Sequence, residues 1–189
     1  MKALAIRAST CSLVVLLAVS LAACSASPPK APPAPPAAAS TRDAVAESER
    51  AWTELMRLEA AKRGAEARAL VLKQLDASDF GTLPGSLRHR WLQRAGMMNI
   101  GAEAYEEGLS IFRYTSGMAE ADQDDWRFRF ICAQMTQQQA ESVHSLTYLV
   151  RKWPEVLPHL DNQMVGRTAL KPAASPQDEA DRFPLLEAL

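Results

Sequence analysis

Few side chains in this sequence have the type and spacing that catalysis or metal binding requires. The histidines stand in separate segments, at His89, His144 and His159. None lies in an HExxH frame or at a helical spacing that suits zinc. Three carboxylates lie close together, at Glu103, Glu106 and Glu107. A solvated helix face explains them without general acid–base chemistry. No GxSxG, Walker-type or dinucleotide glycine pattern occurs. We therefore expect no enzymatic activity, no cofactor and no metal.

A second acidic group precedes Trp126 and consists of Asp122, Asp124 and Asp125. A calcium-binding EF-hand loop in this frame needs a glycine and a glutamate, where the sequence has Arg127 and Ala133. Carboxylates at a helix start accept hydrogen bonds from free amides and complement the positive end of the helix. We predict that these residues cap a helix that begins before Trp126.

The N-terminal segment carries the pattern with the clearest chemistry. Lys2 and Arg7 precede an apolar run, Cys11 to Leu21, that is too short to span a bilayer. The run closes on Leu21-Ala22-Ala23-Cys24. This segment resembles the export signal of bacterial lipoproteins, whose lipobox ends in a cysteine.

The lipoprotein resemblance implies cleavage after Leu21, Ala22 and Ala23, with lipidation of the Cys24 thiol. Two or three acyl chains anchor a protein stably without a transmembrane helix. Ser25 stands where an inner-membrane retention signal would have aspartate, which favours the outer membrane, facing the periplasm. The alternative is an ordinary secretory signal in which Cys24 is incidental.

The composition after residue 23 divides the chain further. Residues 25–40 hold six of the twelve prolines and a single charge, Lys30. Such a segment cannot build a core, and as polyproline II at about 3.1 Å per residue it would extend roughly 50 Å. We expect a signal peptide over 1–23, and a lipidated cysteine with a disordered linker over 24–41. A helical domain over 42–156 and an irregular helical tail over 157–189 follow.

The charge balance argues against nucleic acid as a partner. Removing Lys2 and Arg7 from the 21 basic residues leaves 19 against 22 acidic residues, a formal charge of about −3. The sequence contains no basic stripe, and Arg88, Arg90 and Arg94 are expected on an exposed helix face. With Cys24 lipidated, Cys132 has no intramolecular partner, so we expect a buried thiol. A reactive or intermolecular thiol is the alternative.

Hydrophobic spacing predicts helices alone between about Asp43 and Leu170, with no alternating strand pattern. Five or six helices follow one another, with breaks near Gly64, at Thr82 to Gly85 and at Pro154. Thr136 and Gln139 fit a capping box for the sixth helix. The inward positions predicted on that helix are Ala140, Val143, Leu146, Thr147 and Val150.

Three tryptophans, Trp52, Trp91 and Trp126, stand in the first helices of successive pairs, 39 and 35 residues apart. The third pair resembles a tetratricopeptide repeat through Trp126, Ala133, Ser142, Leu146, Leu149 and Pro154. Phe130 departs from that motif, which has glycine there. The second pair matches only after a shift of one residue, through Leu92, Gly96, Gly108 and Phe112. The resemblance covers about residues 43–155 and implies a short all-α solenoid of helix hairpins. The alternative is a plain helical bundle.

These expectations lead to a binding scaffold in the cell envelope. The concave face of stacked first helices would hold a segment of another envelope protein. Aromatic and arginine side chains anchor interfaces most often, and the candidates are Arg113, Tyr114, Tyr148 and Trp153. A cell-wall enzyme or its accessory is the alternative.

The end of the chain raises a further question. Phe183-Pro184 breaks the helix that Pro176 would start, and the chain ends on the apolar run Leu185 to Leu189. Such an end docks back, faces a partner, or belongs to a shortened version of a longer array without retained activity. We expect the shortened version.

Overall fold

A computed structural model of the chain describes residues 41–171 and 176–189, which form helices and no strand. The predicted lipobox, Leu21 to Cys24, lies outside the described residues, and so does the predicted linker up to position 40. The helices are α1 (Thr41–Ala60), α2 (Gly64–Leu75), η1 (Phe80–Thr82), α3 (Gly85–Gly101), α4 (Tyr105–Thr115), α5 (Gln123–Met135), α6 (Gln139–Lys152), η2 (Pro154–His159), α7 (Asn162–Leu170) and α8 (Pro176–Ala188). None of these helices is long and apolar enough to cross a bilayer.

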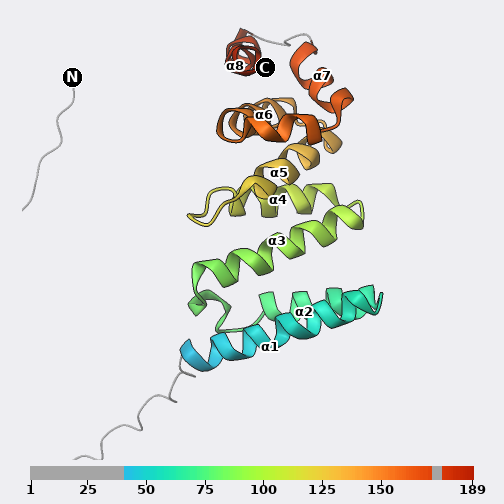
Figure 1. Cartoon of the computed structure of the whole chain (residues 1–189), viewed down its shortest axis with the longest axis vertical. Coiled ribbons are helices and arrows are strands. Elements are labelled where there is room, and N and C mark those ends of the chain that lie inside the picture. Colours follow the sequence, from blue (N-terminus) through green and yellow to red (C-terminus); the bar gives the residue numbers. More distant parts are fainter. Residues whose placement is uncertain (1–40, 172–175) are drawn as a thin grey trace, which may run out of the picture. The chain divides into compact units, whose positions relative to one another are not determined.

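Each helix from α1 to α6 packs against the next one, and α7 and α8 both pack against α6. Figure 1 shows them following one another in chain order, from α1 in cyan to α8 in red. The predicted all-helical fold is confirmed. The breaks predicted near Gly64, at Thr82 to Gly85 and at Pro154 each coincide with a boundary between successive helices.

Three helix hairpins share one turn geometry. The helix pairs α1–α2, α3–α4 and α5–α6 are each joined by three residues, and the middle residue has positive φ: Lys62 (58°), Glu103 (59°) and Gln137 (59°). In every turn the next residue donates a backbone hydrogen bond to the residue five positions earlier. These pairs are Arg63 to Leu58 at 2.9 Å, Ala104 to Asn99 at 2.9 Å and Gln138 to Ala133 at 2.8 Å. This is the Schellman pattern that ends helices.

The packing around these turns repeats as well. Five residues after each left-handed residue stands a buried small residue, Ala67, Gly108 or Ser142. A Cβ atom on Gly108 would lie 3.1 Å from Cys132 Sγ, so the small side chain sets the distance between helices. At Gly101, the last residue of α3, such an atom would have nothing within 4 Å.

The tryptophans are not equivalent within this repeat. Trp52, Trp91 and Trp126 stand 10, 12 and 11 residues before the left-handed residue of their hairpins. Leu92, which stands 11 residues before Glu103, is therefore the counterpart of Trp126. The turn geometry therefore repeats in all three hairpins, whereas the tryptophans do not keep one position relative to the turn.

The first helices of the pairs contact one another through side chains. Trp52 and Trp91 meet edge to face with ring centroids 5.1 Å apart, and Trp91 Nε1 donates to Ser48 Oγ at 2.8 Å. Arg90 pairs with Glu49 of α1 at 2.8 Å, and Arg94 Nε donates to Glu59 at 2.6 Å. The exposed face expected for these arginines is wrong, because both are partly buried and paired with carboxylates of α1.

The cap predicted for α5 is confirmed, whereas the cap predicted for α6 is wrong. Asp122 Oδ1 accepts from the backbone N–H groups of Asp124 and Asp125 at 2.9 and 3.1 Å, and Asp125 Oδ2 accepts from Asp122 N at 2.9 Å. Thr136 instead ends α5, where its hydroxyl donates to Cys132 O at 2.9 Å. The N-cap of α6 is Gln138, which makes no side-chain capping bond.

The inward face predicted for α6 is partly wrong. Val143, Leu146 and Val150 are buried, but Ala140 is exposed and Thr147 is half-buried. The additional buried positions on α6 are Ser142, Ser145 and Leu149.

The C-terminal helices dock on α6. Asp161 caps α7 by accepting from Met164 N at 2.8 Å, within the helical tail predicted from residue 157. The break expected at Pro184 is wrong, because α8 runs through it. A proline inside a helix costs about 3 kcal/mol. Packing against α6 offsets this cost, with Leu185 fully buried in the same core cluster as Trp126. The chain end therefore docks back, while Phe183, Leu186 and Leu189 stay 49–62% exposed.

Candidate binding surface

The four predicted anchors lie in two places. Tyr148 and Trp153 lie together on the last turns of α6, whereas Arg113 and Tyr114 lie on α4. Tyr114 is 58% exposed and makes no aromatic contact among the described residues. Of the four predicted anchors, Tyr148 and Trp153 are the two whose rings contact each other, and they belong to a larger aromatic group.

Three aromatic side chains form a continuous stack at the junction of α5 and α6. Tyr148 stacks on Trp126 with ring centroids 3.8 Å apart and 18° between the planes. Trp153 meets Tyr148 in an edge-type contact, with ring centroids 6.1 Å apart and 64° between the planes. Trp126 is 6% exposed and Tyr148 is 37% exposed, so the stack runs from the core to solvent. Aromatic pairs of this kind contribute about 0.5–1.5 kcal/mol beyond the area they bury.

Basic side chains lie over the faces of these rings. Lys152 Nζ is 4.4 Å from the Trp153 ring centroid and 5.5 Å from that of Tyr148, and it donates to the Tyr148 hydroxyl at 3.4 Å. Arg129 Cζ lies 4.8 Å from the Trp126 ring. Such cation–π contacts are worth about 0.5–1 kcal/mol where they are exposed. They fix cations beside the aromatic stack.

Two adjoining cavities cover the outer face of α6. One, of about 490 Å³, is lined by His144, Thr147, Tyr148, Arg151 and Lys152. The other, of about 470 Å³, shares His144, Thr147 and Arg151 and reaches Ala180 and Pro184 of α8. Because three residues line both, the cavities form one groove. We call this groove, with the stack of Trp126, Tyr148 and Trp153, the α6 surface.

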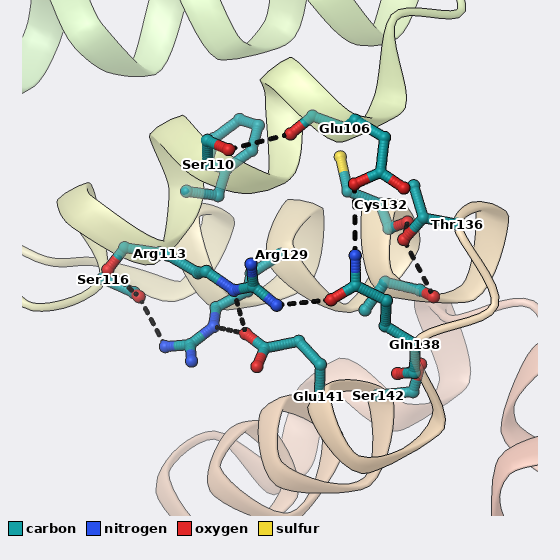
Figure 2. A network of polar contacts seen from close by, with 12 residues as sticks. Glu106, Ser110, Arg113, Ser116, Arg129, Cys132, Thr136, Gln138, Glu141 and Ser142 are labelled. Carbon is teal, nitrogen blue, oxygen red and sulfur yellow. Dashed lines mark hydrogen bonds and ion pairs between the residues drawn. The ribbon is translucent and has the colours of Figure 1, made fainter.

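A polar network at the start of α6 connects this helix to α4 and α5 (Figure 2). Glu141 pairs with Arg129 of α5 at 2.5 Å and with Arg113 of α4 at 3.2 Å. Arg129 Nη1 donates to Ser116 Oγ at 2.8 Å, and Gln138 Nε2 donates to Glu106 Oε2 at 3.2 Å. The network ties α4, α5 and α6 together.

The network also settles the role of Arg113 and the charge of Glu141. Burial would raise the pKa of Glu141, but hydrogen bonds from Arg129 and Arg113 outweigh it and hold the pKa below its ordinary value. Glu141 is therefore ionised at neutral pH, and its charge is neutralised by two guanidinium groups. Arg113 serves as one of them.

A buried histidine–carboxylate pair is the feature that the sequence analysis missed. His89 Nε2 of α3 lies 2.6 Å from Asp125 Oδ2, and Asp125 is fully buried. Together with Asp122, these side chains bring three ligand atoms within 4.8 Å of one another. The carboxylate oxygens of Asp122 and Asp125 accept hydrogen bonds from the backbone N–H groups around the start of α5. This end of the helix carries positive partial charge, which disfavours a bound cation. We therefore interpret the pair as a connection between α3 and α5.

The remaining candidates from the sequence have structural roles or exposed positions. Cys132 is fully buried, as predicted, and burial raises its pKa to about 12. Glu103, Glu106 and Glu107 are exposed, with Glu103 in the turn before α4 rather than on the helix. His144 and His159 are also exposed. The carboxylates thus lie in the solvated setting that the sequence indicated.

A further cavity of about 760 Å³ lies between α5, α6 and α7. Its lining includes Gln134 and Gln139, whose side-chain amides donate to the hydroxyl and the carbonyl of Thr168 at 2.7 and 3.2 Å. These bonds connect α7 to the α5–α6 hairpin. Because both amides bind Thr168 of α7, we assign this cavity to packing between these helices rather than to recognition.

Comparison of the chain with protein-family models, with characterised proteins and with solved structures finds no match. The functional argument therefore rests on the residues of this chain. Among the described residues, the α6 surface is the place where a groove, exposed aromatic rings and cations coincide.

Proposed function

We propose that this protein is a lipid-anchored scaffold of the cell envelope that binds a segment of another envelope protein at the α6 surface. The lipobox pattern Leu21 to Cys24 supports the anchor, with the outer membrane, on its periplasmic side, as the location. Anchoring raises the local concentration of the scaffold at the membrane.

The repeated turn supports a tetratricopeptide-like arrangement of the hairpins. The left-handed residues of the second and third turns, Glu103 and Gln137, are 34 residues apart, which is the length of a tetratricopeptide unit. Lys62 precedes Glu103 by 41 residues, and the connection between α2 and α3 contains the additional turn η1. In such arrays each helix pair buries its apolar face against the next one and presents extended binding surfaces.

The observation that carries the binding proposal is the aromatic and basic character of the α6 surface. Tyr148 and Trp153 are residue types that most often anchor interfaces. Both are accessible and are held by packing on Trp126 and by Lys152. Rings that are already fixed lose little conformational freedom when a partner binds.

The sequence predicted that a partner binds the concave face of the first helices, but few side chains of α1 and α3 are available for such binding. Their basic residues Arg90 and Arg94 are engaged by Glu49 and Glu59. Trp52 is covered by Arg90, whose Cζ lies 4.4 Å from the ring. A partner there would have to break these pairs, so we place binding on α6.

Site-specific photocrosslinking in intact envelopes tests this proposal. A photoreactive phenylalanine derivative replaces Thr147 in the groove, and in a matched control it replaces Leu72, which is 50% exposed on α2. We expect a discrete adduct from position 147 that is lost with Trp153→Ala and absent at position 72. Cys24→Ser should reduce the adduct by releasing the chain from the membrane. Equal adducts at both positions would contradict the proposal.

A further inference from the structure

We propose that the α6 surface recognises an acidic polypeptide segment, with carboxylates over the end of α6 and an apolar side chain on the Tyr148–Trp153 edge. This inference rests on the proposed binding function and specifies the chemistry of the partner. It follows from the charges that line the groove and from how those charges are already engaged.

The groove carries cations that the described part of the chain leaves without a carboxylate. Arg151 and Lys152 are exposed and line the groove, and neither forms an ion pair with a described residue. By contrast Arg57, Arg63, Arg90, Arg94, Arg113 and Arg129 each pair with a glutamate of the protein itself. The imidazole of His144 also lines the groove.

Glu141, an acidic residue among the described lining of this groove, does not neutralise Arg151 and Lys152. Glu141 lines the part near α8, and both Arg129 and Arg113 engage its carboxylate. Glu141 lies in the first turn of α6, whereas Arg151 and Lys152 lie in the last turn, roughly 15 Å away at about 1.5 Å per residue, so these two pairs leave the cations at the end of α6 unaffected. The described lining of the groove therefore favours a negatively charged occupant.

The positions of the aromatic rings favour a polypeptide over a compact anion as the occupant of the groove. Lys152 lies on the face of Trp153, with Tyr148 beside it, so an anion bound by Lys152 is next to apolar ring surface. A peptide places carboxylates and apolar side chains within a few residues of each other. The groove continues past Arg151 to Ala180 and Pro184 of α8, which leaves room for several residues of chain. A phosphate group alone would leave the rings and this extension unused.

The test is selection of random dodecapeptides displayed on phage, with the purified full chain in detergent as bait. We expect the selected peptides to be enriched in aspartate and glutamate relative to the input library. Their affinity should fall about fivefold to tenfold in the double variant Arg151→Gln/Lys152→Gln, as expected for two exposed charge pairs. It should also fall as ionic strength rises.

The matched control is Lys73→Gln, which is compared with the single change Lys152→Gln. Like Lys152, Lys73 is an exposed lysine in the last turn of its helix, so both changes remove the same interaction with a helix end. Lys73 lies on α2, away from the groove, and its removal should leave peptide affinity unchanged. An equal loss in both variants would overturn the proposal, because net charge alone would then explain binding.

The remaining outcomes separate this inference from the proposed function. Peptides that depend on Trp153 but show no acidic enrichment would overturn the acidic partner and retain the binding surface. Failure to select any peptide that depends on Trp153 or Arg151 would overturn both. Vesicles of phosphatidylglycerol, compared with phosphatidylcholine, form the second arm. Binding to the anionic vesicles that requires Arg151 and Lys152, without acidic enrichment, would assign the cations to a lipid surface and overturn the inference.

Discussion

The α1–α3 contact and the α6 surface use the same residue types for different purposes. In the first, Arg90 lies over Trp52 and pairs with Glu49. In the second, Lys152 lies over Trp153 but has no carboxylate partner among the described residues. An arginine or lysine that lies over an aromatic ring thus stabilises the fold where a neighbouring helix supplies a carboxylate partner. Where no neighbour does so, the same arrangement is available to a partner.

The largest effect in this comparison is expected from the tryptophans. Trp91 is fully buried and its Nε1 donates to Ser48, so Trp91→Ala should lower the free energy of unfolding by about 4 kcal/mol. Trp153 is only half-buried, and Trp153→Ala should cost about 1 kcal/mol. Urea unfolding followed by circular dichroism measures both. Similar losses would mean that Trp153 belongs to the core rather than to a surface.

The buried pair between α3 and α5 should come next. Asp125→Ala removes the capping box of α5 and leaves His89 without its partner, and we expect a loss of about 3 kcal/mol. Asp124→Ala is the control, because Asp124 has a 55% exposed side chain and only a 3.7 Å contact with Arg127. Its loss should be a few tenths of a kcal/mol in the same urea experiment. Comparable effects would show that charge at the helix start matters more than the buried pair.

Glu141 supplies a pH-dependent test of the polar network that joins α4, α5 and α6. Glu141→Gln should lower the free energy of unfolding by about 2 kcal/mol at pH 7, because two arginines lose an ionised acceptor. The folded pKa of Glu141 lies below its ordinary value of 4.5. The stabilisation is therefore present above the unfolded pKa and is lost as pH falls through the folded pKa. The difference between wild type and variant should shrink below about pH 4.5, whereas a constant difference would contradict an ionic network.

Cysteine reactivity gives the smallest signal and tests the packing of the second and third hairpins. Cys132 is fully buried with its pKa raised to about 12, so iodoacetamide at pH 8 should leave it unmodified in the folded chain. Peptide mass mapping after denaturation in urea should show rapid alkylation of the same residue. Rapid alkylation without urea would mean that α4 and α5 separate readily.

The sequence predicted the features that depend on neighbouring residues. Helix positions follow from apolar spacing, and the Asp122 cap follows from a local pattern that competes with nothing else nearby. Thr136 shows the limit of local reasoning. The same hydroxyl fits the start of α6 and the end of α5, and the left-handed turn at Gln137 places it where it bonds Cys132 O. Pro184 shows another limit, since contact with α6 holds α8 together across it.

The side-chain arrangement of the α6 surface could not be predicted in the same way. Tyr148 and Trp153 were identified by residue type, but their packing on Trp126 depends on how α5 and α6 cross. His89 and Asp125 are 36 residues apart, and no local pattern signals their pairing. The Schellman turns gave no signal in the sequence either, because their left-handed residues are Lys62, Glu103 and Gln137 rather than glycine or asparagine.

One measurement tests the central distinction between the two regions most directly. Two double variants, Arg90→Gln/Arg94→Gln and Arg151→Gln/Lys152→Gln, are each compared with wild type for thermal stability and for the adduct formed at position 147 in intact envelopes. We predict that the first lowers the melting temperature and keeps the adduct, while the second keeps the melting temperature and loses the adduct. An adduct lost in the first variant and retained in the second would contradict the account.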